Sequence, residues 1–134
     1  MTPGGAAGKR AAFRLIVARS VQWPREEIRE IVRRAFNAVR DGQPLRAVVR
    51  VTHCRERSYR GMATWPDRVM LRVPRGLGDR YCMISHGAKM SDWRDCLAFI
   101  AGHEFHHIWQ YQTKRKGSER GANRAGRLAM ACRS

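Results

Sequence analysis

The sequence predicts a single α+β domain, with a small, twisted and mostly antiparallel sheet, an N-terminal helix over it, and two further helices near the C-terminus. Val-rich or alternating apolar segments are typical of strands, and apolar residues at a 3.6-residue spacing are typical of helices. The 134 residues contain no internal repeat and no second-domain linker, so we expect one domain over residues 11–134. Residues 1–10 form a Pro/Gly/Ala tail that we expect to be disordered.

Four segments have the pattern of strands. In the first, Phe13, Leu15 and Val17 alternate on one face. The second is rich in Val, and the third and fourth join around a Trp-Pro-Asp turn. We expect these strands at residues 10–18, 45–54, 57–63 and 67–73. Residues 74–89 carry four Gly or Pro residues and little periodicity, which predicts a loop leading to the next helix.

Three segments have the pattern of helices. Pro24 opens the first at a favoured position, and Gly42 suits the C′ position after its end. Asp92 or Ser91 is a candidate N-cap of the second helix, and Ser118 of the third, which runs to about residue 132. Small side chains on the third helix would let it pack closely against the second: Ala122, Ala125, Leu128, Ala129 and Cys132.

Composition excludes several classes of protein. Hydrophobic residues make up 43% of the chain and there are four Trp, which argues against disorder. The four Cys are widely spread without a C-x-x-C pair, so we interpret them as reduced thiols. We find no signal-peptide core and no apolar stretch long enough for a membrane span. We therefore expect an intracellular, cytoplasmic protein without a membrane partner.

The chain is strongly basic, with a formal net charge of +16, and 23 of its 27 basic residues are Arg. Such a surface is attracted to phosphate backbones and acidic partners. Arginine richness also follows from the codon bias of a GC-rich genome, and the arginines are scattered along the chain. Nucleic acid is therefore one possible partner, and charge alone does not identify it.

The most specific pattern is H-E-x-x-H, formed by His103, Glu104 and His107 inside the second helix. Residues four apart lie on one helix face a single turn apart, so two imidazoles can converge on one ion. The residue after the first His points about 100° round the helix, where a carboxylate can hold a water without ligating the metal. The pattern predicts a zinc site with Glu104 as the general base.

A catalytic zinc ion usually has three protein ligands and a water, so a third ligand is needed. No His follows His107 and no Asp follows Asp95, which leaves Glu119 as the only downstream carboxylate. The alternative is that Glu119 is an ordinary acidic residue in the first turn of a helix. Cys132 could donate a thiolate from three turns further along. His106 diverges from His103 by about 60° on the helix, so we expect it to be exposed or behind the ligands.

Together with H-E-x-x-H, the sequence Ser-Glu-Arg-Gly-Ala-Asn at residues 118–123 resembles the ImmA/IrrE-type metallopeptidases and the small zincin-like proteins of phages and bacteria. Their downstream motif reads roughly Glu-x-x-Ala-Asn-x-x-Ala, matched here by Glu119, Ala122 and Asn123. Where that family has an aromatic-Ala pair, this chain has Ala-Gly. The resemblance implies a minimal zincin-like fold and Glu119 as the third zinc ligand. Arg-Gly-Met-Ala at residues 60–63 resembles, more distantly, SprT-like proteases, whose third ligand is a His that this chain lacks.

These patterns predict a zinc-dependent metallopeptidase that acts on protein or peptide substrates. His103, His107 and Glu119 would hold Zn²⁺, and Glu104 would take a proton from the metal-activated water. Extended substrate would pair with an edge strand, for which we expect residues 67–73. Two alternatives stay open: a nucleic-acid-associated protein with a structural zinc, and a zincin fold that acts as an inactive interaction module.

Other polar residues allow weaker hypotheses. Tyr81 and His86 precede the metal helix and could stabilise an oxyanion. His53 with Cys54, or Cys82 with His86, could form a second metal site, although neither pair has the spacing of a structural zinc site.

Overall fold

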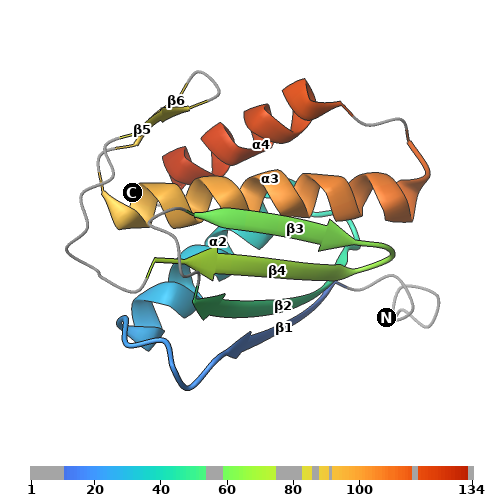
Figure 1. Ribbon diagram of the computed structural model, residues 1–134. Helices are drawn as coiled ribbons and strands as arrows, with labels where there is room; N and C mark the ends of the chain where they lie inside the picture. The colour runs from blue at the N-terminus through green and yellow to red at the C-terminus, as the bar shows by residue number, and fades with distance from the viewer. Residues whose placement is uncertain are drawn as a thin grey trace.

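A computed structural model describes residues 11–53, 59–74, 83–85, 88–90, 92–115 and 118–132. These residues form an α+β structure with three helices, α2 (Arg25–Arg40), α3 (Trp93–Thr113) and α4 (Glu119–Cys132). The main sheet contains β1 (Ala12–Val17), β2 (Arg46–His53), β3 (Arg60–Thr64) and β4 (Arg68–Val73) (Figure 1). The expected tail at residues 1–10 lies outside the described residues.

The described sheet is mixed, with the strand order β1-β2-β4-β3. β1 pairs with β2 and β2 with β4 in parallel, while β3 and β4 form an antiparallel pair. The expectation of a mostly antiparallel sheet was therefore wrong. Helix α2 carries the chain from β1 to β2, and such a crossover is what parallel neighbours need. Alternation along a strand shows which side chains are buried, but it does not show the direction of the neighbouring strand.

The outer position next to β4 is taken by β3, so the expectation that residues 67–73 form the edge was also wrong. The chain leaves β2, forms β3 first, and then returns as β4 between the two. The expected loop at 74–89 contains a short antiparallel pair, β5 (Met83–Ser85) and β6 (Ala88–Met90). Other parts of that loop lie outside the described residues.

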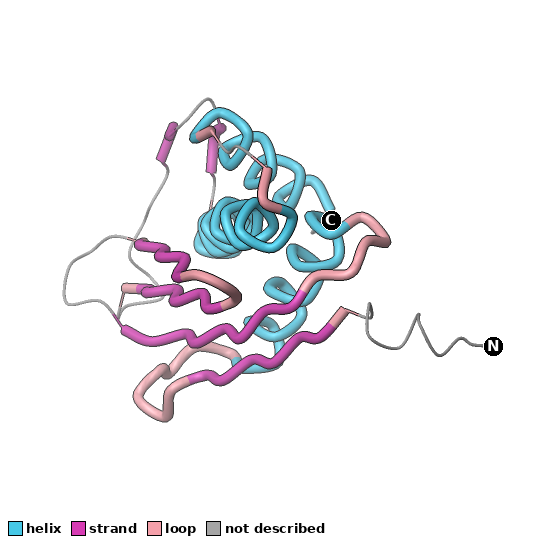
Figure 2. Tube along the Cα trace, turned by 90° about the vertical axis from the view of Figure 1, so that its right-hand side faces the viewer, coloured by secondary structure: helices cyan, strands magenta, loops and turns pink. Residues whose placement is uncertain are grey.

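The described helices lie on one side of the main sheet. α2 and α3 contact the strands and each other, and α4 packs on α2 and α3 (Figures 1 and 2). The core between these layers is apolar, and its fully buried members include Val49, Leu71, Ile28, Leu97 and Phe105. Burying such side chains stabilises the fold by about 1.5–3 kcal/mol each. This packing holds α3 as a rigid support for its polar side chains.

The helix ends agree with the sequence signals. The Asp92 carboxylate accepts a hydrogen bond from the Asp95 amide at 3.1 Å, and the Ser118 hydroxyl oxygen accepts one from the Gly121 amide at 3.0 Å. Both residues therefore act as the expected N-caps. Gly42 follows the end of α2 with φ of 77°, the left-handed conformation that glycine adopts readily. None of the described helices is both long and apolar enough to cross a membrane.

Candidate metal centre

Helix α3 places the two histidines of the motif side by side. The Nε2 atoms of His103 and His107 are 3.3 Å apart, and the two side chains are 14% and 20% exposed. This agrees with the one-turn spacing expected from the sequence. The two ring nitrogens therefore face the same small volume between α3 and α4.

Glu119, in the first turn of α4, completes a cluster of three donor groups. Its Oε1 lies 3.5 Å from His103 Nε2 and its Oε2 lies 2.9 Å from His107 Nε2. One donor atom from each residue can be chosen so that all lie within 4.8 Å of one another. The three residues are thus close enough to hold a metal ion. The Glu119 side chain is 72% exposed, so this position is open to solvent.

Small residues allow α4 to approach α3 closely enough for Glu119 to reach the histidines. A Cβ atom on Gly102 would lie 2.6 Å from the Ala125 carbonyl oxygen and 2.7 Å from the Ala129 Cβ. A Cβ atom on Gly126 would lie 2.8 Å from a ring carbon of Phe99. These distances are well below van der Waals contact, so larger side chains would push the helices apart. The expected packing role is confirmed for Ala122, Ala125 and Ala129, which are buried, and Gly102 supplies the opposing side. It was wrong for Leu128, which is 47% exposed, and for Cys132, which is also exposed.

Gln110 orients one of the two histidines. His107 Nδ1 lies 3.1 Å from Gln110 Oε1, and the Gln110 side chain is buried. An amide oxygen only accepts hydrogen bonds, so His107 donates from Nδ1, and a neutral imidazole with this tautomer has its lone pair on Nε2, the nitrogen that faces Glu119. Sequence reasoning missed Gln110, although its position three residues after His107 places it on the same helix face.

Glu104 lies beside the cluster without belonging to it. Its Oε2 is 3.9 Å from His103 Nε2, and the residue is only 8% exposed because β3 covers it. At Gly61 of β3, a Cβ atom would come within 2.6 Å of Glu104 Cγ. Burial raises the pKa of Glu104 to about 7; the nearby His107 opposes this rise and Glu119 adds to it. The carboxyl group is thus placed to exchange a proton near neutral pH.

The other sequence candidates in the described residues do not belong to the cluster. His106 stacks on Trp109 with ring centroids 5.4 Å apart and leans against Gly121, so it faces α4 beside the ligands. Burial, then the neighbouring His107 and His103, lowers its pKa. Cys132 is exposed at the far end of α4. His53 donates a ring N–H to the Ser20 carbonyl, while Cys54, Tyr81, Cys82 and His86 lie outside the described residues.

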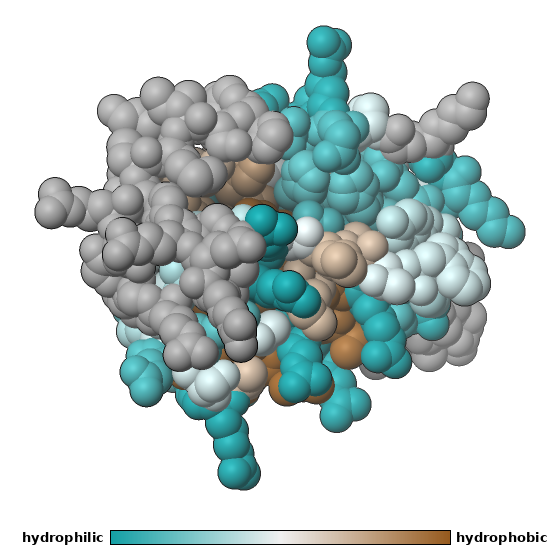
Figure 3. All heavy atoms as spheres, viewed as in Figure 1, coloured by the Kyte–Doolittle hydropathy of each residue, from teal (hydrophilic) through white to brown (hydrophobic). Residues whose placement is uncertain are grey.

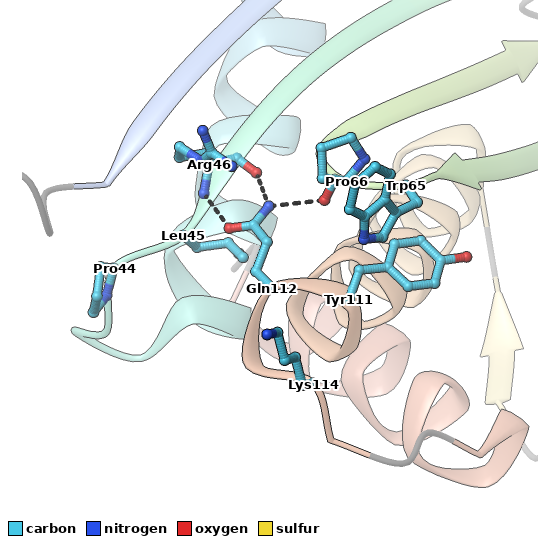
Figure 4. A pocket seen from close by; sticks show the side chains of 8 residues that line it. All are labelled: Pro44, Leu45, Arg46, Trp65, Pro66, Tyr111, Gln112 and Lys114. Atoms are coloured by element: carbon cyan, nitrogen blue, oxygen red, sulfur yellow. Dashed lines mark hydrogen bonds between the residues drawn. The ribbon is translucent and has the colours of Figure 1, made fainter.

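A pocket of about 370 Å³ lies near the end of α3, beyond the histidines (Figure 4). Tyr111, one turn after His107, lies next to the exposed Trp65 of the β3–β4 turn. Gln112 also lines the pocket and donates to the carbonyls of Arg46 and Pro66 at 2.8 and 3.0 Å. The lining combines aromatic, other apolar, amide and basic side chains: Pro44, Leu45, Arg46, Trp65, Pro66, Tyr111, Gln112 and Lys114.

Comparisons of the chain with protein-family models, with curated proteins and with solved structures find no match. The geometry of this site is therefore the basis for assigning a function.

Proposed function

We propose that the protein is a zinc-dependent peptidase with a zincin-like arrangement of its site. The observation that carries this proposal is the position of Glu104, a buried carboxyl group next to three convergent donor groups. A purely structural metal site has no use for a base at that position. His103, His107 and Glu119 are the proposed ligands, and Glu104 is the proposed general base.

The donor distances support a zinc-sized ion. Zinc binds nitrogen and oxygen ligands at about 2.0–2.2 Å with tetrahedral geometry, so its ligand atoms lie about 3.3–3.6 Å apart. The Nε2 atoms of His103 and His107 are 3.3 Å apart. Glu119 approaches His103 with Oε1 at 3.5 Å and His107 with Oε2 at 2.9 Å, so the three groups surround a space of about this size. Two imidazoles and one carboxylate form a known type of catalytic ligand set and leave one position open. Bound zinc would supply Lewis-acid polarisation of a carbonyl and a lowered pKa of water.

Glu104 would move the proton in this reaction. Its Oε2 takes a proton from the attacking water and then delivers it to the nitrogen of the leaving amine. A group that does both steps works best with a pKa near the working pH, and burial under β3 moves Glu104 in that direction. Water has access from the side where Glu119 is exposed.

The substrate would lie along β3, the outer strand of the described sheet next to β4. An extended peptide can add to such an edge through main-chain hydrogen bonds. Because Gly61 of β3 contacts Glu104, a peptide on this edge would pass close to the base and the ligands. The pocket that Trp65 and Tyr111 help to line would then receive a substrate side chain.

Two substitutions test the assigned roles. Glu119→Ala should reduce the zinc content and, since metal binding contributes to folding, lower the melting temperature in chelator-free buffer. Glu104→Gln keeps the shape of the side chain and should leave both quantities nearly unchanged, while hydrolysis of unfolded casein is abolished. Metal analysis, thermal melts and a casein assay on both variants measure these effects.

The outcomes separate the metal from the chemistry. Full zinc content in Glu119→Ala would show that another group is the third ligand. Casein cleavage by Glu104→Gln at the wild-type rate, or no cleavage by the zinc-loaded wild type, would reject the peptidase proposal. A structural or interaction role for the site would then take its place.

A further inference from the structure

One face of the main sheet is not covered by any described helix (Figures 1 and 2). The residues at its outward positions make this face strongly basic. The outward positions of its four described strands include six exposed arginines and no acidic residue: Arg14, Arg46, Arg50, Arg60, Arg68 and Arg72. The other outward positions are small or apolar: Ala12, Ile16, Val48, Thr52, Met62, Thr64 and Met70. Figure 3, viewed from the same side as Figure 1, shows hydrophilic residues interspersed with hydrophobic ones.

The strand register arranges these side chains in rows across the sheet. A mostly apolar row crosses the middle and consists of Ile16, Arg50, Met70 and Met62. One flanking row consists of Arg14, Val48, Arg68 and Thr64, and the other contains Thr52, Arg72 and Arg60. The surface is thus an apolar row with arginines on both sides. We call it the arginine face.

Arginine richness of the whole chain does not explain the arginine face. On α2, Arg33 and Arg34 both pair with Glu30, at 2.7 and 2.8 Å, so charges of opposite sign are mixed there. On the sheet, Arg60 lies directly opposite Arg72, and like charges opposite each other destabilise a strand pair. Ile16 and Met62 are also large apolar side chains that stay 42% and 60% exposed.

We propose that the arginine face binds single-stranded nucleic acid. The guanidinium groups of the outer rows would pair with phosphates, since Arg binds phosphate oxygens through a planar fork of donors. Unpaired bases would lie on Ile16, Met70 and Met62 and on the Arg50 guanidinium plane. A duplex keeps its bases stacked inside and would leave the apolar row without a partner. This proposal does not depend on the metal site, which lies on the helical side of the sheet.

Fluorescence anisotropy with an oligothymidylate of roughly 20 nucleotides tests the proposal. The full-length protein should bind it at about 50 mM salt and lose affinity steeply as salt increases. A triple variant, Arg14→Gln with Arg50→Gln and Arg72→Gln, should bind at least about tenfold more weakly. Its slope of log affinity against log salt should be shallower by about 2, because each lost phosphate contact on a single strand contributes about 0.7.

A matched triple variant on α2, with Arg29, Arg33 and Arg34 each changed to Gln, removes the same charge from another surface. This α2 variant should bind the oligothymidylate within about twofold of the wild-type affinity, because the proposed phosphate contacts are on the arginine face and not on α2. Changing Ile16 and Met62 to Ser should weaken single-strand binding without changing duplex binding. All these positions are at least partly exposed, so thermal melts should confirm that each variant is folded.

Three results would overturn the proposal. The first is absence of binding by the wild type at about 50 mM salt. The second is an equal loss of affinity in both triple variants, which would indicate attraction by overall charge. The third is equally tight binding of a duplex of the same length or of polyglutamate, which would indicate a different polyanion as the partner.

Discussion

Gly61 of β3 provides a test of the proposed base that leaves the ligands untouched. In Gly61→Ala, the new Cβ would lie 2.6 Å from Glu104 Cγ and 2.7 Å from its Oε2. Ordinary contact between carbon atoms is about 3.5–4.0 Å, so the Glu104 side chain must move by about 1 Å. Displacing a catalytic group by this distance reduces the rate about 100-fold, which corresponds to about 2.7 kcal/mol in the activation barrier.

The assay compares kcat/KM for casein with zinc content and melting temperature. Zinc content should be unchanged, because the three atoms nearest to the new methyl group all belong to Glu104, which is not one of the proposed ligands. The Gly61 backbone is outside the left-handed region, so alanine introduces no backbone strain there. Activity should therefore fall without loss of metal.

Gly121→Ala is the matched control. Its Cβ would approach His106 Nε2 to 2.8 Å, a similar overlap with a side chain of α3 that is not a ligand. This variant should keep its activity. Wild-type activity in Gly61→Ala, or a loss of zinc in parallel with the loss of activity, would refute the assignment of Glu104 as a positioned base.

Two further predictions concern the support of the ligands. Gln110→Leu removes the hydrogen-bond acceptor for His107 Nδ1 and should weaken zinc affinity about 10- to 100-fold. Competition with a chromophoric chelator measures this affinity. Unchanged affinity would show that the hydrogen bond does not orient the His107 ring. Gly102→Val should force α4 away from α3 and lower the free energy of unfolding, measured in urea, by about 1–3 kcal/mol. Because Glu119 would move with α4, zinc binding should also weaken. A variant with wild-type stability and full zinc affinity would show that the close approach of the two helices does not position Glu119.

The parts of the site that depend on local geometry could be predicted from the sequence. His103 and His107 lie one helical turn apart, and that spacing brings their Nε2 atoms to 3.3 Å. Glu119 was expected because it is the only carboxylate downstream of His107, and it lies with the histidines. The N-caps Asp92 and Ser118 were also correct, because capping needs residues within one turn.

The parts that depend on contacts between distant segments could not be predicted in the same way. Nothing within residues 67–73 shows that β3 will take the outer position and leave β4 inside the sheet. The contact of Gly61 with Glu104 joins residues on different elements, and only the packing of β3 on α3 creates it. In the sequence, Gly61 is therefore an ordinary glycine in a strand.

The arginine face illustrates the same limit for surfaces. Along β2 and β4, buried apolar residues lie between the arginines, which is the ordinary pattern of a half-buried sheet. The sequence therefore suggested scattered charge. The register then aligns Arg14 with Arg68 across Val48, and Arg72 with Arg60, so that separate alternating strands form one continuous basic surface. Because a binding surface of this kind is a property of strand order, a change of order with the same strands would disperse it. The mixed sheet thus determines both candidate sites: the outer β3 covers Glu104 on one side, and the central β4 joins the arginine rows on the other.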